Sequence, residues 1–489
     1  MMNNLEKKVR VRFAPSPTGF LHVGGLRTAL YNYLFAKKNG GEFLLRIEDT
    51  DQKRFVEGAK ESLLSTLKNM NLEWDNEKIY VQSENLETYK KYAEQLVAEG
   101  KAYYCFCEPE RLEEVRAQKQ AEKKPPMYDR YCLTNLSQAE INQKLKENCP
   151  ATIRLKVPKD EIIEFKDVVR GKVSFSTNTI DDQVLLKSDG FPTYHLANVI
   201  DDHLMNITHV IRGEEWLPST PKHILLYKAF GWEMPKFAHL PLLLNPDKSK
   251  LSKRQGDVAV EDYLQKGYLK EALTNFVALL GWNPGEGSVQ EIFSLEELVE
   301  KFELEKVHKA GAVFELKKLD WLNAQYIKKL SIEELFLACI PFLKEKEFFL
   351  EANAEKRNDA YVKKVLVVER ERLSKFSQVC EENRFFFTEI DYPTELLSWK
   401  ELTAKELIES LEESTKALTE IAENDWELTQ IEEKLLAAAG EKRGDLLWPL
   451  RVALTGAQKS PSPFEIAWVL GKKESLQRIA KAIEKLQEA

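Results

Sequence analysis

The sequence predicts an α/β protein with a Rossmann-type parallel sheet, split by an inserted α+β domain and followed by all-α C-terminal domains. Three observations predict this fold. A strand, a helix and a second strand follow one another between residues 9 and 49, an order typical of a βαβ unit and hence of a parallel sheet. A charged, irregular segment interrupts the strands from residue 85 onward. Beyond residue 330, apolar residues recur at helical spacing.

The first elements are the clearest. Alternating residues from Val9 to Phe13 predict a strand. The loop PSPTGFLHVGG (residues 15–25) follows, and then a helix from Leu26 to Lys38 that a stretch of asparagine and glycine stops. EFLLRIED (residues 42–49) is the next predicted strand.

The middle of the chain is less regular. Charged helical stretches are broken at KKPP (residues 123–126), and ATIRLKV (residues 151–157) is β-like. Sheet-like order returns with QVLLKSDGFPTYHLANVIDDH (residues 183–203), and the polar loop NPDKSKLSKRQGD (residues 245–257) closes this part. Helices dominate thereafter. One predicted apolar stripe consists of Leu407, Ile408, Leu411, Leu418, Ile421 and Ala422.

Length and composition exclude several classes of protein. A chain of 489 residues exceeds what one core normally supports, so several domains are expected. No apolar run is long enough to span a membrane, and none of signal-peptide type occurs near the N-terminus. The six cysteines are too sparse for a disulfide scaffold, so we expect a cytoplasmic protein. The net charge of −8 argues against a generic polyanion binder, although nucleic-acid contact depends on where basic residues lie.

The glycine-lined helix start after the first strand predicts an anion site, because free backbone N–H groups and the helix dipole point at a ligand there. Gly24 and Gly25 let a phosphorylated ligand approach the backbone, and His22 can donate to phosphate oxygens. The alternative is a plain tight turn with a buried histidine.

The sequence KLSKR, from Lys250 to Arg254, lies in a polar loop where basic side chains need no core role. It is either a solvated charge run or a loop that closes on a triphosphate and neutralises charge in the transition state.

These two motifs carry a family resemblance. His22-Val23-Gly24-Gly25 resembles the HIGH motif of class I aminoacyl-tRNA synthetases, and Lys250–Arg254 resembles their KMSKS loop. RFAPSPTGFLHVGG, RIEDTD, FPTYHLANVIDDH, VIRGEEW and DWLNAQYI resemble, in this order, the bacterial-type glutamyl-tRNA synthetases. The resemblance covers nearly the whole chain and is weakest after residue 330. It implies a monomer with ATP and Mg2+, L-glutamate and tRNA(Glu) as partners, and no membrane.

The resemblance also implies the site residues. The catalytic residues are His22, Lys250 and Lys253. The ATP-binding residues are His22, Gly24, Gly25, Glu215, Trp216, Lys250, Ser252 and Lys253, and the glutamate-binding residues are Arg12, Ala14, Ser16, Glu48, Tyr194, Asn198 and Arg212.

The chemistry of the residues agrees with these roles. Guanidinium groups at Arg12 and Arg212 suit planar carboxylates, and Glu48 can accept from an ammonium group. An ordinary ion pair or helix cap is the alternative for each. Arg212 decides the substrate, because the matching position in the related glutaminyl enzymes is uncharged. Leaving this guanidinium buried without a partner costs roughly 3–5 kcal/mol.

The resemblance divides the chain into five segments. They are the first half of the Rossmann catalytic domain (residues 1–84), an inserted acceptor-end-binding domain (85–183), the second half of the catalytic domain (184–245), the KMSKS-type loop with a tRNA stem-contact domain (246–330), and a helical anticodon-binding region (331–489). In the last segment Lys442, Arg443, Arg451 and Lys459 are candidate tRNA contacts.

A Cys-x-Cys pair and a third cysteine indicate a zinc site in the inserted domain. Cys105, Cys107 and Cys132 supply three ligands. Resemblance to a shorter paralogue with the same Tyr-x-x-x-Cys spacing implies that Tyr128 can complete the set. Some family members have a histidine two residues beyond the third cysteine, but here this position is Thr134. The alternative is a remnant site without metal. The other cysteines, Cys149, Cys339 and Cys380, are expected in the core.

Four other functions compete. A paralogue that modifies a tRNA nucleoside would end after the catalytic part, and a non-catalytic tRNA-binding protein would have lost His22 or Lys253. A small-molecule nucleotidyltransferase would give the helical C-terminal third no purpose. An enzyme that also charges tRNA(Gln) stays open, because the deciding anticodon contacts cannot be placed from the sequence.

Overall fold

The protein is described by a computed structural model that covers residues 8–54, 56–251, 259–285, 287 and 289–488. The chain divides into two compact units, which are considered separately. The first is Met1–Leu264 with Lys270–Lys318, and the second is Gln265–Leu269 with Leu319–Ala489.

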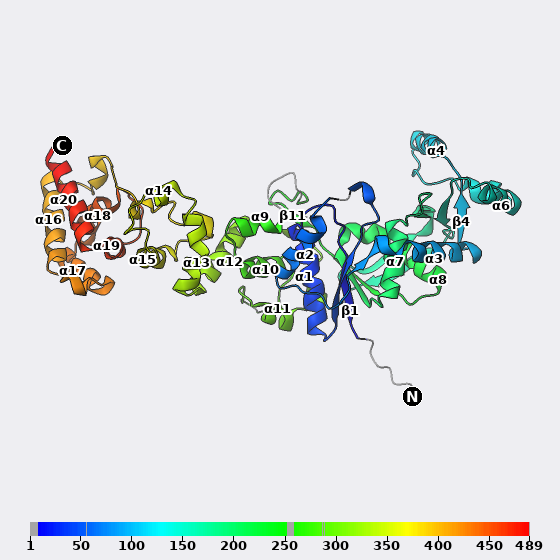
Figure 1. Cartoon of the computed structure of the whole chain (residues 1–489), viewed down its shortest axis with the longest axis horizontal. Coiled ribbons are helices and arrows are strands. Elements are labelled where there is room, and N and C mark those ends of the chain that lie inside the picture. The colour runs from blue at the N-terminus through cyan, green and yellow to red at the C-terminus, as the bar shows by residue number, and fades with distance from the viewer. Residues whose placement is uncertain (1–7, 55, 252–258, 286, 288, 489) are drawn as a thin grey trace, which may run out of the picture. The chain divides into compact units, whose positions relative to one another are not determined.

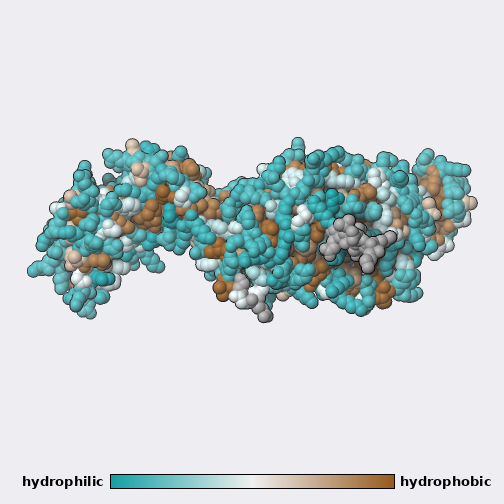
Figure 2. All heavy atoms as spheres, turned by 90° about the horizontal axis from the view of Figure 1, so that it is seen from below, coloured by the Kyte–Doolittle hydropathy of each residue, from teal (hydrophilic) through white to brown (hydrophobic). Residues whose placement is uncertain are grey.

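The surface is mostly hydrophilic on the face shown in Figure 2, where apolar side chains occur in small, scattered groups. Among the described residues, no helix is both long and apolar enough to cross a membrane.

The predicted βαβ unit is confirmed (Figure 1). Strand β1 (Arg10–Phe13), helix α1 (Val23–Lys38) and strand β2 (Glu42–Ile47) follow one another, and the two strands pair in parallel. Strand β3 (Tyr80–Val81) extends the sheet in the order β1-β2-β3. The helix begins earlier than predicted because His22 caps it, and it ends at Lys38, as predicted, directly before the Asn-Gly-Gly stretch.

A second sheet lies beside the first. Strand β9 (His209–Gly213) pairs in parallel with β10 (Lys236–Leu240), and β10 pairs in parallel with β6 (Ile162–Asp167). Strand β7 (Gly171–Ser176) adds an antiparallel edge. The backbone N–H of Thr208 donates to the carbonyl of Arg10 at 2.9 Å, which places β9 next to β1. The predicted parallel sheet therefore includes strands from both sides of the central segment.

A third, antiparallel sheet joins two strands of the central segment with β8 (Val184–Leu186), which directly follows that segment. It has the order β4-β5-β8, with β4 (Ala102–Cys105) and β5 (Thr152–Leu155). The β-like stretch at 151–157 is thus confirmed. The segment 85–183 supplies β6 and β7 to the second sheet as well, so its predicted borders with the catalytic halves stay predictions.

The sheet-like prediction for residues 183–203 is wrong beyond β8. Helix α7 (Tyr194–Leu204) occupies the second half of this stretch. The physical reason is in the sequence, since Leu196, Val199 and Ile200 are spaced three and four apart and are fully buried on one face of the helix. Alternation with period two stops at the Gly-Phe-Pro turn.

The remaining elements of the first unit are mostly helices that cover the sheets. They are η1 (Gln52–Arg54), α2 (Ala59–Asn69), η2 (Gln82–Asn85), α3 (Leu86–Ala98), α4 (Pro109–Ala121), α5 (Tyr131–Asn135), α6 (Gln138–Lys146), η3 (Thr177–Thr179), η4 (Glu214–Ser219), α8 (Thr220–Phe230), β11 (Leu243–Leu244), α9 (Val260–Gln265), α10 (Lys270–Ala278), α11 (Leu295–Lys301), η6 (Leu304–Lys306) and β12 (Ala312–Val313).

The second unit is all-α in its described residues, which confirms the predicted class. Most of the predicted apolar stripe lies on α16 (Ala404–Thr419), where Leu407, Leu411 and Leu418 are buried. The prediction is wrong for Ile421 and Ala422, because the helix ends before them, and Ala422 is exposed. Its elements are α12 (Leu316–Lys329), α13 (Ile332–Leu343), α14 (Glu347–Leu350), α15 (Asp359–Glu369), η7 (Phe376–Gln378), η8 (Arg384–Phe386), η9 (Thr394–Leu397), α16 (Ala404–Thr419), η10 (Glu423–Asp425), α17 (Leu428–Ala439), α18 (Arg443–Thr455), α19 (Pro463–Leu470) and α20 (Lys472–Glu488).

Candidate active site

One large cavity of about 1050 Å³ in the first unit brings together residues from distant parts of the chain. His22 from the first loop and Lys250 from the polar loop both line it. The predicted residues on its wall are Arg12, Ala14, Ser16, His22, Gly24, Gly25, Glu48, Tyr194, Asn198, Arg212, Glu215, Trp216 and Lys250. Ser252 and Lys253 lie outside the described residues.

The imidazole of His22 folds back over the start of α1. Its Nδ1 atom accepts a hydrogen bond from the backbone N–H of Gly25 at 3.1 Å, so His22 is the N-cap of the helix. A ring nitrogen that accepts carries no proton, and the neutral ring therefore has its N–H at Nε2. The side chain is exposed rather than buried, which contradicts the plain-turn alternative with a buried histidine.

The two glycines make room for this arrangement. A Cβ atom at Gly24 would lie 3.0 Å from the His22 ring, and one at Gly25 would lie 2.8 Å from Leu21 Cδ1. The glycines thus make room for the ring of His22 and the side chain of Leu21. This role adds to the predicted one, which is to let a ligand approach the backbone.

Arg12 and Glu48 already belong to a buried ion-pair network. Arg12 donates to Asp202 from Nε at 2.9 Å and from Nη2 at 3.3 Å. Arg46 bridges Asp202, at 2.7 Å from Nη1, and Glu48, at 2.9 Å from Nη2. Burial alone would raise the pKa of Asp202, but the guanidinium groups of Arg12 and Arg46 lower it. Only two of the five N–H groups of Arg12 are used by Asp202, so others remain for a ligand.

Arg212 is different because its partners in the described residues are neutral. Its Nη1 donates to the hydroxyl of Tyr194 at 2.8 Å, its Nη2 to Thr220 Oγ1 at 3.1 Å, and its Nε to His239 Nε2 at 3.2 Å. The side chain is 5% exposed and faces the cavity. A buried guanidinium without a paired carboxylate favours an anionic ligand.

Two aromatic rings and one carboxylate complete the wall beside Arg212. The rings of Tyr194 and Trp216 pack with centroids 4.4 Å apart, and Trp216 stays 39% exposed. Asn198 lies one turn after Tyr194 on α7 and donates to Glu48 at 3.4 Å. The carboxylate of Glu215 folds under Gly213, where an added Cβ would lie 2.2 Å from Oε2.

The described residues on both sides of the 252–258 gap contact the same wall of the cavity. Leu251 donates to the carbonyl of Leu243 at 2.9 Å, which sets Lys250 beside β11. On the other side, Ala259 forms a β-bridge with His22, and Val260 donates to the carbonyl of Leu21 at 2.9 Å.

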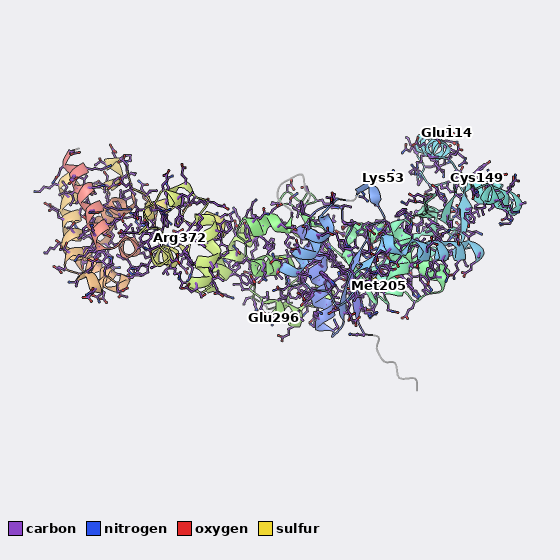
Figure 3. All side chains as sticks on the ribbon, in the orientation of Figure 1. Lys53, Glu114, Cys149, Met205, Glu296 and Arg372 are labelled. Carbon is purple, nitrogen blue, oxygen red and sulfur yellow. The ribbon has the colours of Figure 1, made fainter. Side chains whose placement is uncertain are left out.

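Several residues of the site are not among those predicted from the sequence. Asp202, Arg46, His239 and Asp167 are buried and hold the predicted arginines in place. The sequence feature that could have identified them is a charged or polar residue within an otherwise apolar strand or helix. Thr50, Asp51, Lys53 and Arg54, around η1, also line the cavity. Figure 3 shows Lys53 on this segment.

Comparison with known proteins places this geometry in a family. The model for tRNA synthetases class I (E and Q), catalytic domain, matches residues 8–321. The chain belongs to the class I tRNA synthetases of the E and Q type. A model of an anticodon binding domain matches residues 334–483.

Relatives of this class I family cover nearly the whole chain. A glutamate–tRNA ligase of Prosthecochloris aestuarii is 50% identical, covering 99% of this chain and 100% of the relative. One of Chlorobaculum parvum is 50% identical and covers 98% of both chains. A crystal structure of a glutamate tRNA ligase from Elizabethkingia meningosepticum, in complex with its amino acid, has a TM-score of 0.87 at 40% identity and covers 98% of this chain and 100% of that one.

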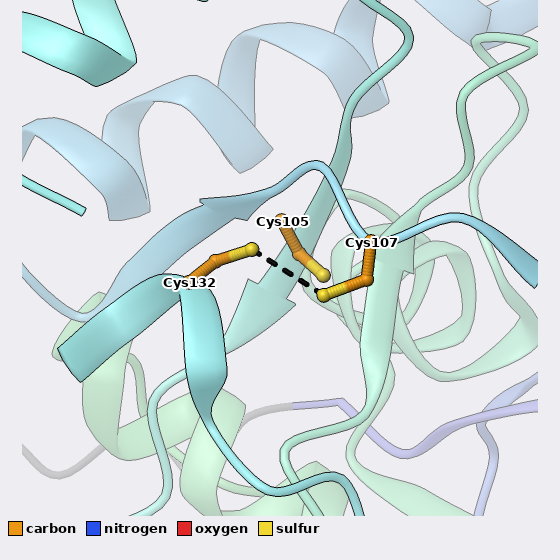
Figure 4. Close-up of side chains that lie close together, drawn as sticks. All are labelled: Cys105, Cys107 and Cys132. Atoms are coloured by element: carbon orange, nitrogen blue, oxygen red, sulfur yellow. Dashed lines mark hydrogen bonds between the residues drawn. The ribbon is translucent and has the colours of Figure 1, made fainter. Parts of the chain in front are cut away.

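The three cysteines of this class I family member do not line the cavity: Cys105 ends β4, Cys107 lies two residues after it, and Cys132 lies on α5 (Figure 4). The sulfur atoms of Cys107 and Cys132 are 3.5 Å apart, and all three ligand atoms lie within 4.8 Å of one another. The Tyr128 hydroxyl lies 3.4 Å from the sulfur of Cys105 and 3.3 Å from that of Cys107.

The other polar candidates lie outside this cluster. The hydroxyl of Thr134 lies 3.2 Å from the carbonyl of Arg130, and it is exposed. Cys149 follows α6 (Figure 3) and is half-buried rather than in the core, so the core prediction is wrong for it, whereas it is confirmed for Cys339 and Cys380.

In the second unit, Lys442, Arg443 and Lys459 are exposed, which leaves them available as tRNA contacts. Arg451 instead donates to the carbonyls of Ser460 at 2.8 Å and Pro461 at 2.7 Å. It therefore holds the loop that precedes α19, a structural role that the sequence analysis did not predict.

Proposed function

We propose that this protein is a glutamate–tRNA ligase. It activates L-glutamate with ATP to glutamyl-adenylate, releases pyrophosphate, and transfers glutamate to the 3′-terminal ribose of tRNA(Glu). Membership of the class I family and the curated relatives named above support this activity. The single structural observation that carries the choice of glutamate is Arg212, a buried guanidinium on the cavity wall whose partners among the described residues are neutral.

Arg212 favours a carboxylate over an amide at the end of the substrate side chain. A glutamate γ-carboxylate gives the guanidinium a charged partner, whereas the amide of glutamine has no net charge. Leaving a buried charge without its partner costs roughly 3–5 kcal/mol, which is ample for discrimination. Rejection of aspartate depends on reach, because one methylene is worth only about 1–3 kcal/mol.

The other end of glutamate meets the ion-pair network. Glu48 accepts from the α-ammonium group, assisted by Asn198 on α7, whereas Tyr194 is bonded to Arg212 at the side-chain end of the substrate. Arg12, held by Asp202, has N–H groups left for the substrate. Ala14 and Ser16 lie on the same wall beside the substrate backbone.

ATP with Mg2+ occupies the part of the cavity next to α1. The backbone N–H of Gly24, the helix dipole and the Nε2–H of His22 favour its phosphates, whereas Gly25 lines the same wall and donates its own N–H to His22 Nδ1. Glu215 and Trp216 line the adenosine side. Lys250 and, outside the described residues, Ser252 and Lys253 complete the set, with Lys253 stabilising the charge that develops on the α-phosphate.

The reaction needs no covalent nucleophile from the protein. The α-carboxylate of glutamate attacks the α-phosphate in line, pyrophosphate leaves, and the ribose hydroxyl of tRNA then attacks the adenylate. Orientation and charge stabilisation supply most of the rate. The five domain assignments, the monomeric state and the cytoplasmic location stay predictions.

Exchange of labelled pyrophosphate into ATP tests this function. We expect exchange with glutamate that requires tRNA, and none with glutamine. R212A should strongly reduce exchange with glutamate and lower the preference for glutamate over glutamine. K253A should lower the turnover of adenylate formation far more than it weakens glutamate binding. Exchange with glutamine alone, or no exchange with any amino acid, contradicts the proposal.

We also propose that Cys105, Cys107, Cys132 and Tyr128 bind one zinc ion. The four ligand atoms already converge, and a tetrahedral site with Zn–S bonds of about 2.3 Å places its sulfur atoms about 3.8 Å apart, close to the 3.5 Å between Cys107 and Cys132. The backbone N–H of Phe106 donates to Cys132 at 3.4 Å, and Arg111 donates to Cys107 at 3.4 Å, so the sulfur atoms are held by neighbours.

Metal analysis of the purified protein tests the zinc site. We expect one zinc per chain, a lower zinc affinity in Y128F and C132S, and no change in the control C149S, because Cys149 lies outside the cluster. A protein that remains metal-free after exposure to zinc, or a Y128F variant with unchanged affinity, contradicts this ligand set.

A further inference from the structure

Three polar side chains lie side by side on adjacent strands behind the glutamate pocket. Asp167 ends β6, His239 lies on β10, and Arg212 lies on β9, directly opposite His239 in the parallel register. All three are buried, with Asp167 and His239 fully inaccessible to solvent. The strand register therefore builds a row that runs from Asp167 through the imidazole to Arg212.

The hydrogen bonds along this row have one direction. The Nε–H of Arg212 can only donate, so His239 Nε2, at 3.2 Å, must accept. The ring then carries its proton on Nδ1, which donates to Asp167 Oδ2 at 2.6 Å. The other carboxylate oxygen, Oδ1, accepts from the backbone N–H groups of Val169 at 3.0 Å and Arg170 at 2.8 Å.

We propose that Asp167 and His239 are positioning residues for Arg212, which they orient toward the cavity while leaving its charge available for the substrate carboxylate. This inference rests on the proposed function. A carboxylate bonded directly to Arg212 would neutralise it and remove the preference for glutamate. A neutral imidazole fixes the plane of the guanidinium without that loss, and Asp167 fixes the tautomer of the imidazole.

The charge states agree with this arrangement. Burial lowers the pKa of His239, and the guanidinium of Arg212 lowers it further, whereas the hydrogen bond to Asp167 raises it. The net pKa lies below its ordinary value, so the ring is neutral near pH 7. Burial alone would raise the pKa of Asp167, but hydrogen bonds from His239 and the Arg170 backbone lower it. Asp167 belongs to the segment predicted to bind the tRNA acceptor end, so that segment also helps to order the amino-acid pocket.

Substitutions can separate tautomer control from simple packing. In D167N the amide oxygen can keep the backbone bonds, which turns the NH2 group toward His239. The imidazole must then accept at Nδ1 and carry its proton on Nε2, where it opposes the N–H of Arg212. H239Q keeps an acceptor near the position of Nε2, whereas H239N keeps only the contact to Asp167.

The measurement is tRNA-dependent pyrophosphate exchange at varied glutamate, glutamine and ATP, with the full-length protein. We expect D167N and H239N to raise the KM for glutamate roughly ten- to a hundredfold, to leave the KM for ATP unchanged and to narrow the preference over glutamine. H239Q should stay much closer to the wild type. A matched control is H209N, because His209 lies on β9 outside the cavity wall and bonds to Thr208.

Three results overturn the inference. They are an unchanged KM for glutamate in D167N and H239N, an H239Q variant as defective as H239N, or equal increases in KM for glutamate and for ATP. Failure of the proposed function is distinct, since wild-type protein would then show no glutamate-dependent exchange at all.

Discussion

Arg12 and Asp202 form a buried two-point ion pair, with Nε–Oδ1 at 2.9 Å and Nη2–Oδ2 at 3.3 Å, although 190 residues separate them in sequence. The same carboxylate also accepts from Arg46 at 2.7 Å, so one acid joins β1, β2 and α7. Asp202 thus has two roles: it holds the strands and helix together, and it sets the position of an arginine that lines the cavity.

Replacing this shared carboxylate should destabilise the first unit strongly. D202N leaves two buried guanidinium groups short of a charged partner, and breaking a buried pair costs about 3–5 kcal/mol. Urea unfolding, followed by hydrogen exchange in β2 and α7, measures the effect in this unit. The control E84Q removes an exposed pair with Lys78 and should cost less than about 1 kcal/mol. Equal losses in the two variants would contradict the assignment.

His22 should contribute to catalysis through Nε2 and to the helix through Nδ1. H22N keeps an oxygen that can accept from the N–H of Gly25, because asparagine is a good N-cap, but it lacks the distal donor. We expect turnover of adenylate formation to fall about 10²–10³-fold while the thermal midpoint changes little. H22A should lose both functions. A normal turnover in H22N would remove Nε2 from the mechanism.

The sequence was most informative where local pattern and tertiary structure agree. The first strand, α1 and the second strand were predictable from periodicity and from the Asn-Gly-Gly stop. The motifs identify Arg12 and Arg212 but not their partners. Asp202 is 190 residues from Arg12, and His239 is opposite Arg212 only through the register of two strands. Helix α7 was mispredicted because the preceding strand suggested continued sheet, although Leu196, Val199 and Ile200 carried the helical spacing.

Gly213 should control the placement of Glu215. An added Cβ would lie 2.2 Å from the carboxylate of Glu215, and this flexible side chain can swing away at little cost to stability. We therefore expect G213A to raise the KM for ATP several-fold, which corresponds to a loss of about 1 kcal/mol in binding free energy, and to leave the KM for glutamate unchanged.

A double-mutant cycle checks that Gly213 acts through this carboxylate. If it does, G213A should add little to the defect of E215A in ATP binding. Fully additive effects would show that Gly213 acts on ATP binding by another route.

Asp201, the neighbour of Asp202, gives the first unit a specific pH dependence. It is fully buried, and it accepts from Gln82 Nε2 at 2.7 Å and from the hydroxyl of Tyr89 at 2.8 Å. Burial raises its pKa to about 6, an effect that Arg46 partly offsets. The Oε1 atom of Gln82 has no hydrogen-bond partner in the described structure. The amide of Gln82 can therefore flip and accept from an asparagine at position 201.

Because the folded pKa of Asp201 lies above its unfolded value, the folded state binds the proton more tightly. The resulting stability is fully present below about pH 4 and is lost as the pH rises through about 6. D201N cannot titrate, so the wild type should lose about 2–3 kcal/mol relative to it between these limits. Unfolding by urea at several pH values, read from hydrogen exchange in α7, measures the difference in free energy of unfolding between the wild type and D201N. For the control E84Q, this difference from the wild type should not change with pH. The prediction would be contradicted if the free energies of unfolding of wild type and D201N differ by a constant amount, or if the wild type becomes more stable relative to D201N as the pH rises. Either result would mean that Asp201 stays ionised in the folded protein.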